Sequence, residues 1–297
     1  VLDVECVMHD VLRLSKSGKG KRNKMQSSLG EYKEIIVARA TDEEIRSKRK
    51  RSGGAVTAIL IYLLESKILD GVVIVKAKEG LQTEVVVAKN REEMLIAAAN
   101  EWPVAPNLRM MKEAIAEKEI QDCGVIVTPC QAQGIRLMQE YPMTETDLGR
   151  NIKMIVGSFC YGTFTHTSFR TFLKEKQGLE PADVKRVEVT SEFLEITLKN
   201  GKRVEIATRD VLTHVQSGCL ICHDLTAAAS DISTGVIPTR PRFTTLIVRT
   251  QFGQEVVKEA IKAQYLEIAP LEIGRPFIEN MIKDMAEEKI RRAQMLW

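Results

Sequence analysis

Residues 217–224 of this 297-residue chain read Ser-Gly-Cys-Leu-Ile-Cys-His-Asp, and residues 230–235 read Ser-Asp-Ile-Ser-Thr-Gly. Two residues separate the thiols of Cys219 and Cys222, and a tight turn over that spacing brings both sulfurs to the same side. A zinc ion or an iron-sulfur cluster normally takes four protein ligands. This stretch therefore offers half of a soft-metal site, and the other half has to come from elsewhere in the chain.

Two more cysteines follow predicted strands. Cys130 comes shortly after the β-branched run of residues 125–127, and Cys160 comes shortly after a similar run over residues 154–156. In open α/β sheets, ligand-binding groups collect at the carboxyl ends of the strands. We therefore expect Cys130 and Cys160 to project to one edge of the sheet, where the loop with the first two cysteines can complete the site.

The same residues also allow a plainer interpretation. Cys130 and Cys160 can be small buried apolar residues, while Cys219 and Cys222 form a redox dithiol or half of a zinc site. Spacing alone does not separate these alternatives. Cys6 has no second cysteine near it in the sequence, and Cys123, at the entry to a predicted strand, is most simply a packed or surface thiol, so we expect neither to be a ligand.

Composition is that of an ordinary globular protein. The chain has 43 basic and 40 acidic residues, a net charge of +3, which gives no general reason to expect nucleic acid or an anionic membrane as a partner. No apolar stretch reaches the length of a membrane span. The first residues carry Asp3, Glu5 and Asp10, unlike a secretory signal. We expect a cytoplasmic protein whose cysteines are thiols or ligands rather than disulfides.

Apolar periodicity and turn residues predict an α/β fold with a mixed β-sheet core flanked by helices, a cysteine-bearing loop region and C-terminal helices. The turn at residues 199–202, Lys-Asn-Gly-Lys, predicts a hairpin that makes the sheet mixed. The predicted strands cover residues 34–40, 72–76, 83–88, 125–127, 154–158, 187–189, 194–199, 203–207 and 245–250. The predicted helices cover residues 55–66, 91–100, 107–119, 133–140 and 163–175, and the chain from Gln254 onward.

Three regions are expected along the chain. Residues 1–30 form an extension whose Gly, Ser and Lys content does not favour a packed core. Residues 31–253 form the main domain, and residues 254–297 form a C-terminal helical segment. That segment carries an apolar stripe, which either docks a partner or packs on the chain's own core. The stripe consists of Phe277, Ile278, Met281, Ile282 and Met285.

Several segments resemble the beta-subunit family of coenzyme F420 hydrogenases and dehydrogenases. The resemblance spans roughly residues 31 to 265 and is carried by residues 52–58, 68–73, 128–131, 157–160, 219–224, 230–235 and 248–250. It implies one [4Fe-4S] cluster and one FAD, with coenzyme F420, a 5-deazaflavin, as substrate. It also implies a ligand set for the cluster, which consists of Cys130, Cys160, Cys219 and Cys222.

The resemblance further implies a flavin site opened by the glycine pair at residues 53 and 54. Glycines that open a helix let a phosphate approach the backbone amides, although here they can simply allow the turn to form. The implied site consists of Ser52, Gly53, Gly54, Thr57, Trp102, Asn107, Pro129 and Gln131. At residues 100–103 the chain reads Asn-Glu-Trp-Pro, where the family usually has Gly-Ser/Thr-Lys-Tyr, so a cation for an anionic ligand is missing.

By this resemblance the chain is an electron-transfer subunit, since a cluster moves single electrons, F420 takes a hydride, and a flavin does either. The implied partners are iron-sulfur subunits of a hydrogenase, formate dehydrogenase or heterodisulfide reductase type complex. His223 and Asp224 either tune the cluster or form a surface pair. Two alternatives stay open, namely an assembly subunit that keeps the cluster without flavin chemistry, and a zinc-stabilised binding module.

Overall fold

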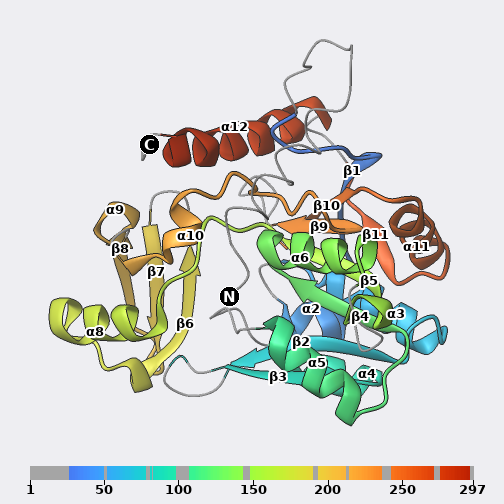
Figure 1. Cartoon of the computed structure of the whole chain (residues 1–297), viewed down its shortest axis with the longest axis horizontal. Coiled ribbons are helices and arrows are strands. Elements are labelled where there is room, and N and C mark those ends of the chain that lie inside the picture. Colours follow the sequence, from blue (N-terminus) through green and yellow to red (C-terminus); the bar gives the residue numbers. More distant parts are fainter. Residues whose placement is uncertain are drawn as a thin grey trace, which may run out of the picture.

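The β-branched runs of the sequence assemble into one eight-stranded sheet (Figure 1). The computed structural model describes residues 27–49, 52–77, 81, 83–97, 107–142, 148–189, 193–211, 214–235, 242–270 and 275–294. In spatial order the strands are β11 (Leu266–Ile268), β1 (Glu34–Ala40), β10 (Thr244–Val248), β9 (Ile232–Gly235), β5 (Ile152–Ser158), β4 (Cys123–Val127), β2 (Gly71–Ala77) and β3 (Thr83–Ala88).

The sheet is mixed, as the sequence predicted. β2, β4, β5 and β9 pair in parallel, while β10 pairs antiparallel with both β9 and β1. Two reversals restore the direction, so β1 runs the same way as β9, β5, β4 and β2. The carboxyl ends of these five strands therefore meet at one edge of the sheet, which we call the carboxyl edge.

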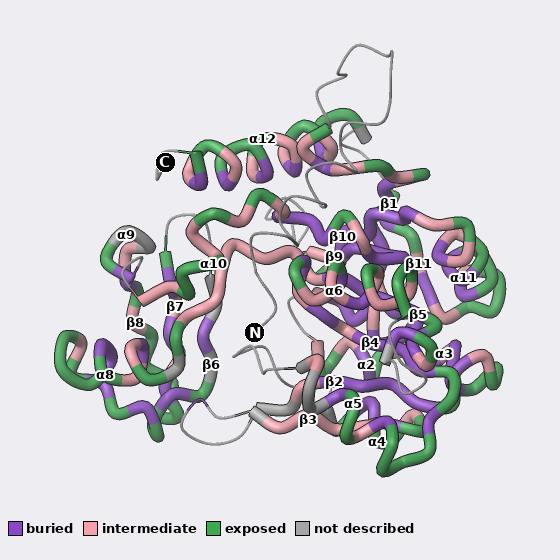
Figure 2. The backbone as a smooth tube through the Cα atoms, in the orientation of Figure 1, coloured by how far each residue is buried: buried purple, intermediate pink, exposed green. Residues whose placement is uncertain are grey.

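Alternation along the strands divides the core into two faces. In β1, Ile36 and Ala38 pack on one face and Ile35 and Val37 on the other. The first face is covered by α3 (Ala55–Glu65), α4 (Arg91–Ala97) and α11 (Gln251–Lys262). The second is covered by α5 (Asn107–Glu117), α6 (Pro129–Glu140) and α12 (Arg275–Gln294). Figure 2 shows the resulting buried residues concentrated along the strands.

A second, smaller sheet holds the predicted hairpin. β6 (Val184–Val189), β7 (Phe193–Leu198) and β8 (Arg203–Ala207) pair antiparallel, and the Leu198 amide donates to the Lys202 carbonyl across the turn. We expected these strands in the mixed sheet, and that expectation is wrong. The apolar side chains of this sheet pack on their own helix, α8 (His166–Gln177), and so form a separate core.

Short helices fill most of the remaining connections. They are α2 (Glu43–Lys48), α7 (Leu148–Asn151), α9 (Thr208–Val211) and α10 (Ser217–Leu220), together with the 3-10 turn η2 (Pro181–Asp183). Among the described residues, no helix combines the length and the apolar content needed to cross a membrane.

Both ends of the described chain pack on the main sheet. Residues 1–26 of the expected extension lie outside the described residues, but Leu29 is fully buried in the second face. The prediction of helix throughout from Gln254 is wrong at β11, which pairs with β1. On α12, Ile278 and Ile282 of the apolar stripe are buried against the core, whereas Phe277 is 49% exposed.

The packing of α12 predicts unequal costs along its apolar stripe. Ile282→Ala should lower the free energy of unfolding by about 2–5 kcal/mol, because the side chain is fully buried. Phe277→Ala should lower it by about 1 kcal/mol or less. Urea unfolding followed by circular dichroism measures both, and equal losses would contradict the assignment of α12 to the core.

Candidate functional site

The carboxyl edge of the main sheet carries two of the candidate cysteines. Cys130 is the second residue of α6, which starts directly after β4, and Cys160 lies two residues beyond the end of β5. β4 and β5 are parallel neighbours, with Val127 paired to Gly157 at their ends. The expectation that these two cysteines follow strands to one edge is thus confirmed, with the difference that Cys130 already belongs to a helix.

The loop with the other two cysteines is tied to this edge by backbone hydrogen bonds. Cys219 lies in α10, and the Cys222 amide donates to the Cys219 carbonyl at 3.4 Å, which closes the expected tight turn. The Cys160 amide donates to the carbonyl of Leu225 at 2.9 Å. The Gln216 amide donates to the carbonyl of Thr163 at 2.8 Å. The segments that follow Cys160 and flank Cys219 therefore lie side by side.

The four thiols influence one another electrostatically. The pKa of Cys160 is raised to about 11, mainly by burial and with smaller contributions from the thiols of Cys219 and Cys130, while the charge of Lys289 opposes the rise. Burial also raises the pKa of Cys219, with added contributions from Cys130 and Cys222. All four are free thiols rather than disulfides. The fold therefore gathers Cys130, Cys160, Cys219 and Cys222 from three separate segments into one region.

Sulfur is a soft donor, and thiolates hold either one zinc ion or an iron-sulfur cluster. Four thiolates bound tetrahedrally to one zinc ion would lie about 3.8 Å from each other, given Zn–S bonds of about 2.3 Å. A four-iron cluster is larger and holds its thiolates farther apart. Within the described residues, no group of three His, Cys, Asp or Glu side chains is close enough to hold a single ion. The donor chemistry of the four thiols fits either centre.

The amino end of α6 shapes the surroundings of Cys130. The Thr128 amide donates to Oε1 of Gln131 at 3.0 Å, which forms one side of a capping box, and Pro129 takes the first helical position. The Thr128 hydroxyl lies 3.3 Å from the Cys130 sulfur. The helix dipole favours negative charge on that sulfur. Pro129 and Gln131, which we expected near a flavin, thus have a local role in starting the helix.

The glycine pair of the expected flavin turn is required by packing. Gly53 and Gly54 have φ angles of +67° and +74°. A Cβ on Gly53 would lie 2.1 Å from the Arg242 carbonyl oxygen, and a Cβ on Gly54 would lie 2.5 Å from Cγ2 of Ile45. Gly54 is also the N-cap of α3, and no side chain caps that helix. The glycines by themselves therefore do not indicate a ligand, but the helix end that they open is of the kind that binds phosphate.

The other flavin candidates have different outcomes. Ser52 is half-buried, and its carbonyl accepts a hydrogen bond from the Thr244 hydroxyl. Thr57 is 4% exposed within α3. Trp102 lies outside the described residues, and Asn107 opens α5 with its side chain undescribed. The glycine turn lies at the carboxyl end of β1, and Cys160 lies beyond the carboxyl end of β5. These two strands are three positions apart in the sheet, so the two ends share the carboxyl edge at a lateral separation of about 14 Å.

Two polar residues that sequence reasoning did not single out fix the cysteine loop. Arg249, 9% exposed, donates to the carbonyls of Leu29 and Glu31 and to the hydroxyls of Thr226 and Ser233. On α12, the Lys289 ammonium is buried between two loop carbonyls. The helical spacing of the sequence could have revealed Lys289, because this residue continues the buried row of Ile278 and Ile282 along α12. For Arg249, the sequence around residues 248–250 offered only the family resemblance.

Several polar side chains around the cysteine segments are engaged in structural hydrogen bonds. Arg136 bonds to Asp231 at 2.6 Å, and Gln139 donates to the carbonyl of Ile152 at 2.7 Å. The Asp224 carboxylate accepts from the Ala228 amide at 2.9 Å, so it caps the turn after the cysteines. His223 is exposed. The first three side chains therefore stabilise the loop and sheet.

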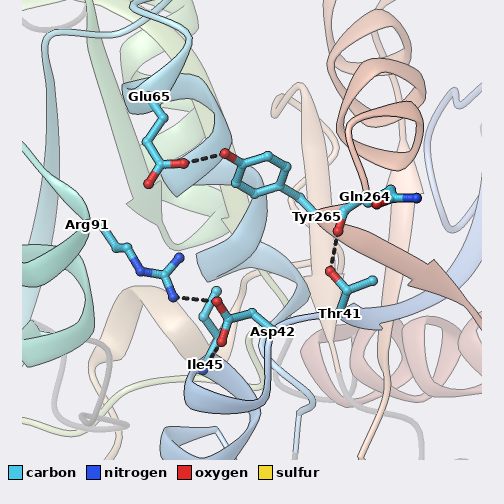
Figure 3. Close-up of a pocket in the computed structure, with 7 residues that line it drawn as sticks. All are labelled: Thr41, Asp42, Ile45, Glu65, Arg91, Gln264 and Tyr265. Atoms are coloured by element: carbon cyan, nitrogen blue, oxygen red, sulfur yellow. Dashed lines mark hydrogen bonds and ion pairs between the residues drawn. The ribbon is translucent and has the colours of Figure 1, made fainter.

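A pocket of about 370 Å³ lies apart from these residues (Figure 3). Its lining consists of Thr41, Asp42, Ile45, Glu65, Arg91, Gln264 and Tyr265. Arg91 pairs with Asp42, and the Tyr265 hydroxyl donates to Glu65, a bond that raises the pKa of Tyr265 to about 12. Its polar groups thus largely satisfy one another, and it contains none of the residues predicted for the site.

An α/β sheet with four free thiols gathered at its carboxyl edge defines a class of protein that can hold a soft metal centre. Comparisons with known proteins identify the family. Two family models match the chain. The model of the N-terminal part of the coenzyme F420 hydrogenase/dehydrogenase beta subunit matches residues 35–112, and the model of its C-terminal part matches residues 120–273. The chain therefore belongs to the coenzyme F420 hydrogenase/dehydrogenase beta subunit family.

Individual relatives agree with this assignment. The chain is 34% identical over 263 residues to the coenzyme F420 hydrogenase subunit beta of Methanothermobacter thermautotrophicus, across 88% of this chain and 92% of that protein. It is 26% identical to the F420-dependent formate dehydrogenase subunit beta of Methanocaldococcus jannaschii, across 78% and 61%. A chain of the F420-reducing [NiFe] hydrogenase complex from Methanosarcina barkeri has a similar structure, with a TM-score of 0.81 and 28% identity across 91% and 92%.

The packing of the glycine turn leads to a prediction about stability. Gly54→Ala should lower the free energy of unfolding more than Gly178→Ala, because both positions have positive φ but only Gly54 has a neighbour where the Cβ would go. Gly178 is the C-cap of α8, and a Cβ there would meet no atom within 4 Å, so Gly178→Ala should lower the free energy of unfolding by only about 1 kcal/mol. Thermal or urea unfolding of both variants measures the difference. If Gly54→Ala cost no more than its control, close packing would not be the reason for this glycine.

Proposed function

We propose that the chain is an electron-transfer subunit that passes electrons between an iron-sulfur partner and coenzyme F420. In this proposal Cys130, Cys160, Cys219 and Cys222 hold one [4Fe-4S] cluster, and FAD binds at the same sheet edge. The observation that carries it is the convergence of four free thiols at the carboxyl edge of a chain from this family.

The thiol set suits such a cluster in its donor chemistry. Thiolates are the usual ligands of iron-sulfur clusters, and ligation replaces the thiol proton. Burial raises the pKa of Cys160 and Cys219, so these two thiols release their protons only beside a strong compensating positive charge, which bound iron would supply. At Cys130 the amino end of α6 adds favourable backbone charge.

The flavin part of the proposal rests on the amino end of α3. The Ser52–Gly54 turn and the first amides of α3 would receive the FAD phosphates, with Thr57 behind them in the helix. Trp102, Asn107, Pro129 and Gln131 remain proposed neighbours of the flavin. When bound, a flavin exchanges single electrons with a cluster and a hydride with F420. The chain's own contribution is to hold both groups at one edge.

The proposed partners follow from the names of the relatives. These are beta subunits of a hydrogenase and of a formate dehydrogenase, both described as F420-linked. A cluster bound at the Cys219 loop needs an electron donor or acceptor beside it. We therefore propose an iron-sulfur subunit of such a complex as the partner and place its docking surface next to α10. A heterodisulfide reductase type complex is a further proposed partner.

An anaerobic absorption spectrum of the purified chain, with acid extraction of any flavin, tests this function. The proposal predicts both a broad iron-sulfur band and released FAD. An iron-sulfur band without flavin would instead indicate an assembly subunit that has lost flavin chemistry. A colourless protein that contains zinc would indicate a zinc-stabilised binding module and contradict the proposal.

Single alanine variants test the ligand set. Replacing Cys130, Cys160, Cys219 or Cys222 should remove most of the bound iron and bleach the visible band, since a cluster that loses one of four thiolates is poorly held. Cys123→Ala is the matched control, because Cys123 is a fully buried thiol of the core away from the loop. Iron and sulfide analysis of folded protein gives the readout. Full iron content in all four variants would rule out this ligand set.

A further inference from the structure

Lys289 is a buried cation beside the candidate cluster ligands. The residue lies on α12, three turns beyond Ile278, and is only 2% exposed. Its ammonium donates to the carbonyl oxygens of Cys160 and Asp224, both at 2.6 Å. In Figure 1 the C-terminal half of α12 lies over the α10 segment. One side chain from the end of the chain thus joins the two loops that carry three of the four thiols.

Within the part of the chain that the structure describes, the charge of Lys289 has no carboxylate partner, since no Asp or Glu carboxylate oxygen lies within 4.0 Å of its ammonium. The charge lowers the pKa of both Cys160 and Cys219, against the larger opposite effect of burial, so it acts on those two thiols. A buried cation without an anion is unfavourable. Four thiolates around an iron-sulfur core carry net negative charge and would supply the missing anion.

We propose that Lys289 is a positioning residue for the cluster, which holds the Cys160 and Cys219–Asp224 segments together and balances the negative charge of the ligated centre. This inference rests on the proposed function. Each electron that a bound cluster would accept from the iron-sulfur partner would add one negative charge to the centre, with no bond made or broken. The fixed positive charge of Lys289 would therefore favour the reduced form.

Arg292 provides a matched control on the same helix. Its guanidinium lies one turn further along α12 and donates to the Tyr161 carbonyl at 2.6 Å. It therefore also binds the segment after Cys160, but its hydrogen bond goes to Tyr161 and not to Cys160 or the Cys219–Asp224 segment. Arg292→Gln therefore disturbs α12 and that segment but leaves in place the ammonium that joins the Cys160 and Asp224 carbonyls.

The test is a redox titration of the full chain, reconstituted with iron and sulfide and followed by electron paramagnetic resonance and visible absorption. Lys289→Gln and Lys289→Met should shift the one-electron equilibrium about tenfold toward the oxidised form, a fall of about 59 mV in midpoint potential. Lys289→Arg, which keeps the charge, and Arg292→Gln should shift it less than about threefold. The same samples are analysed for iron and for melting temperature.

Several results would overturn the inference. It fails if Lys289→Gln holds a cluster at the wild-type potential, or if Arg292→Gln shifts the potential as much as Lys289→Gln does. If the uncharged variants lose iron, retention of iron by Lys289→Arg supports the role of charge, and equal loss contradicts it. Absence of any cluster in the wild-type chain would instead refute the proposed function itself, so the two failures are distinguishable.

Discussion

The geometry of the site depends on the hydrogen bonds of one buried group, the guanidinium of Arg249. It makes five hydrogen bonds, to the carbonyls of Leu29, Glu31 and Thr226 and to the hydroxyls of Thr226 and Ser233, which uses every donor that the group has. Burial lowers the pKa of Arg249 to about 10, which reflects the free-energy cost of removing the charged group from water. The hydrogen bonds to these five acceptors offset that cost. The start of the described chain, β9 and the segment after the cysteines are fixed to one point.

Lys289 complements Arg249 from a later element of the chain. Arg249 binds the loop after the cysteines at Thr226, and Lys289 binds it at Asp224, so two buried cations hold consecutive parts of one segment. Arg249 directly follows β10 and Lys289 lies on α12, so both come from parts of the chain that follow the cysteines. The Cys219–Asp224 loop therefore depends on the packed sheet and α12 rather than on its own short helix. This explains why a chain without a dedicated ferredoxin-like motif can position four thiols.

Much of this arrangement was predictable from the sequence because the signals are local. The strand before Cys130, the strand before Cys160 and the turn between Cys219 and Cys222 follow from apolar runs and spacing, and the parallel order of β4 and β5 brings them together. The separate three-stranded sheet was not predictable, since its strands alternate like those of the main sheet and only packing on α8 decides where they go. Lys289 was missed because a lysine within a run of charged residues, here Glu287 to Arg292, is typical of a solvent-exposed helix face.

The central claim is that thiols from three segments at one sheet edge hold a single four-iron cluster. Mössbauer spectroscopy of the full chain, reconstituted anaerobically with isotopically enriched iron, tests it most directly because it reports the nuclearity of the iron. The account predicts one type of centre, a [4Fe-4S] cluster, with four iron atoms per chain. A spectrum of isolated iron sites, or of a two-iron cluster that persists under reducing anaerobic conditions, would contradict it.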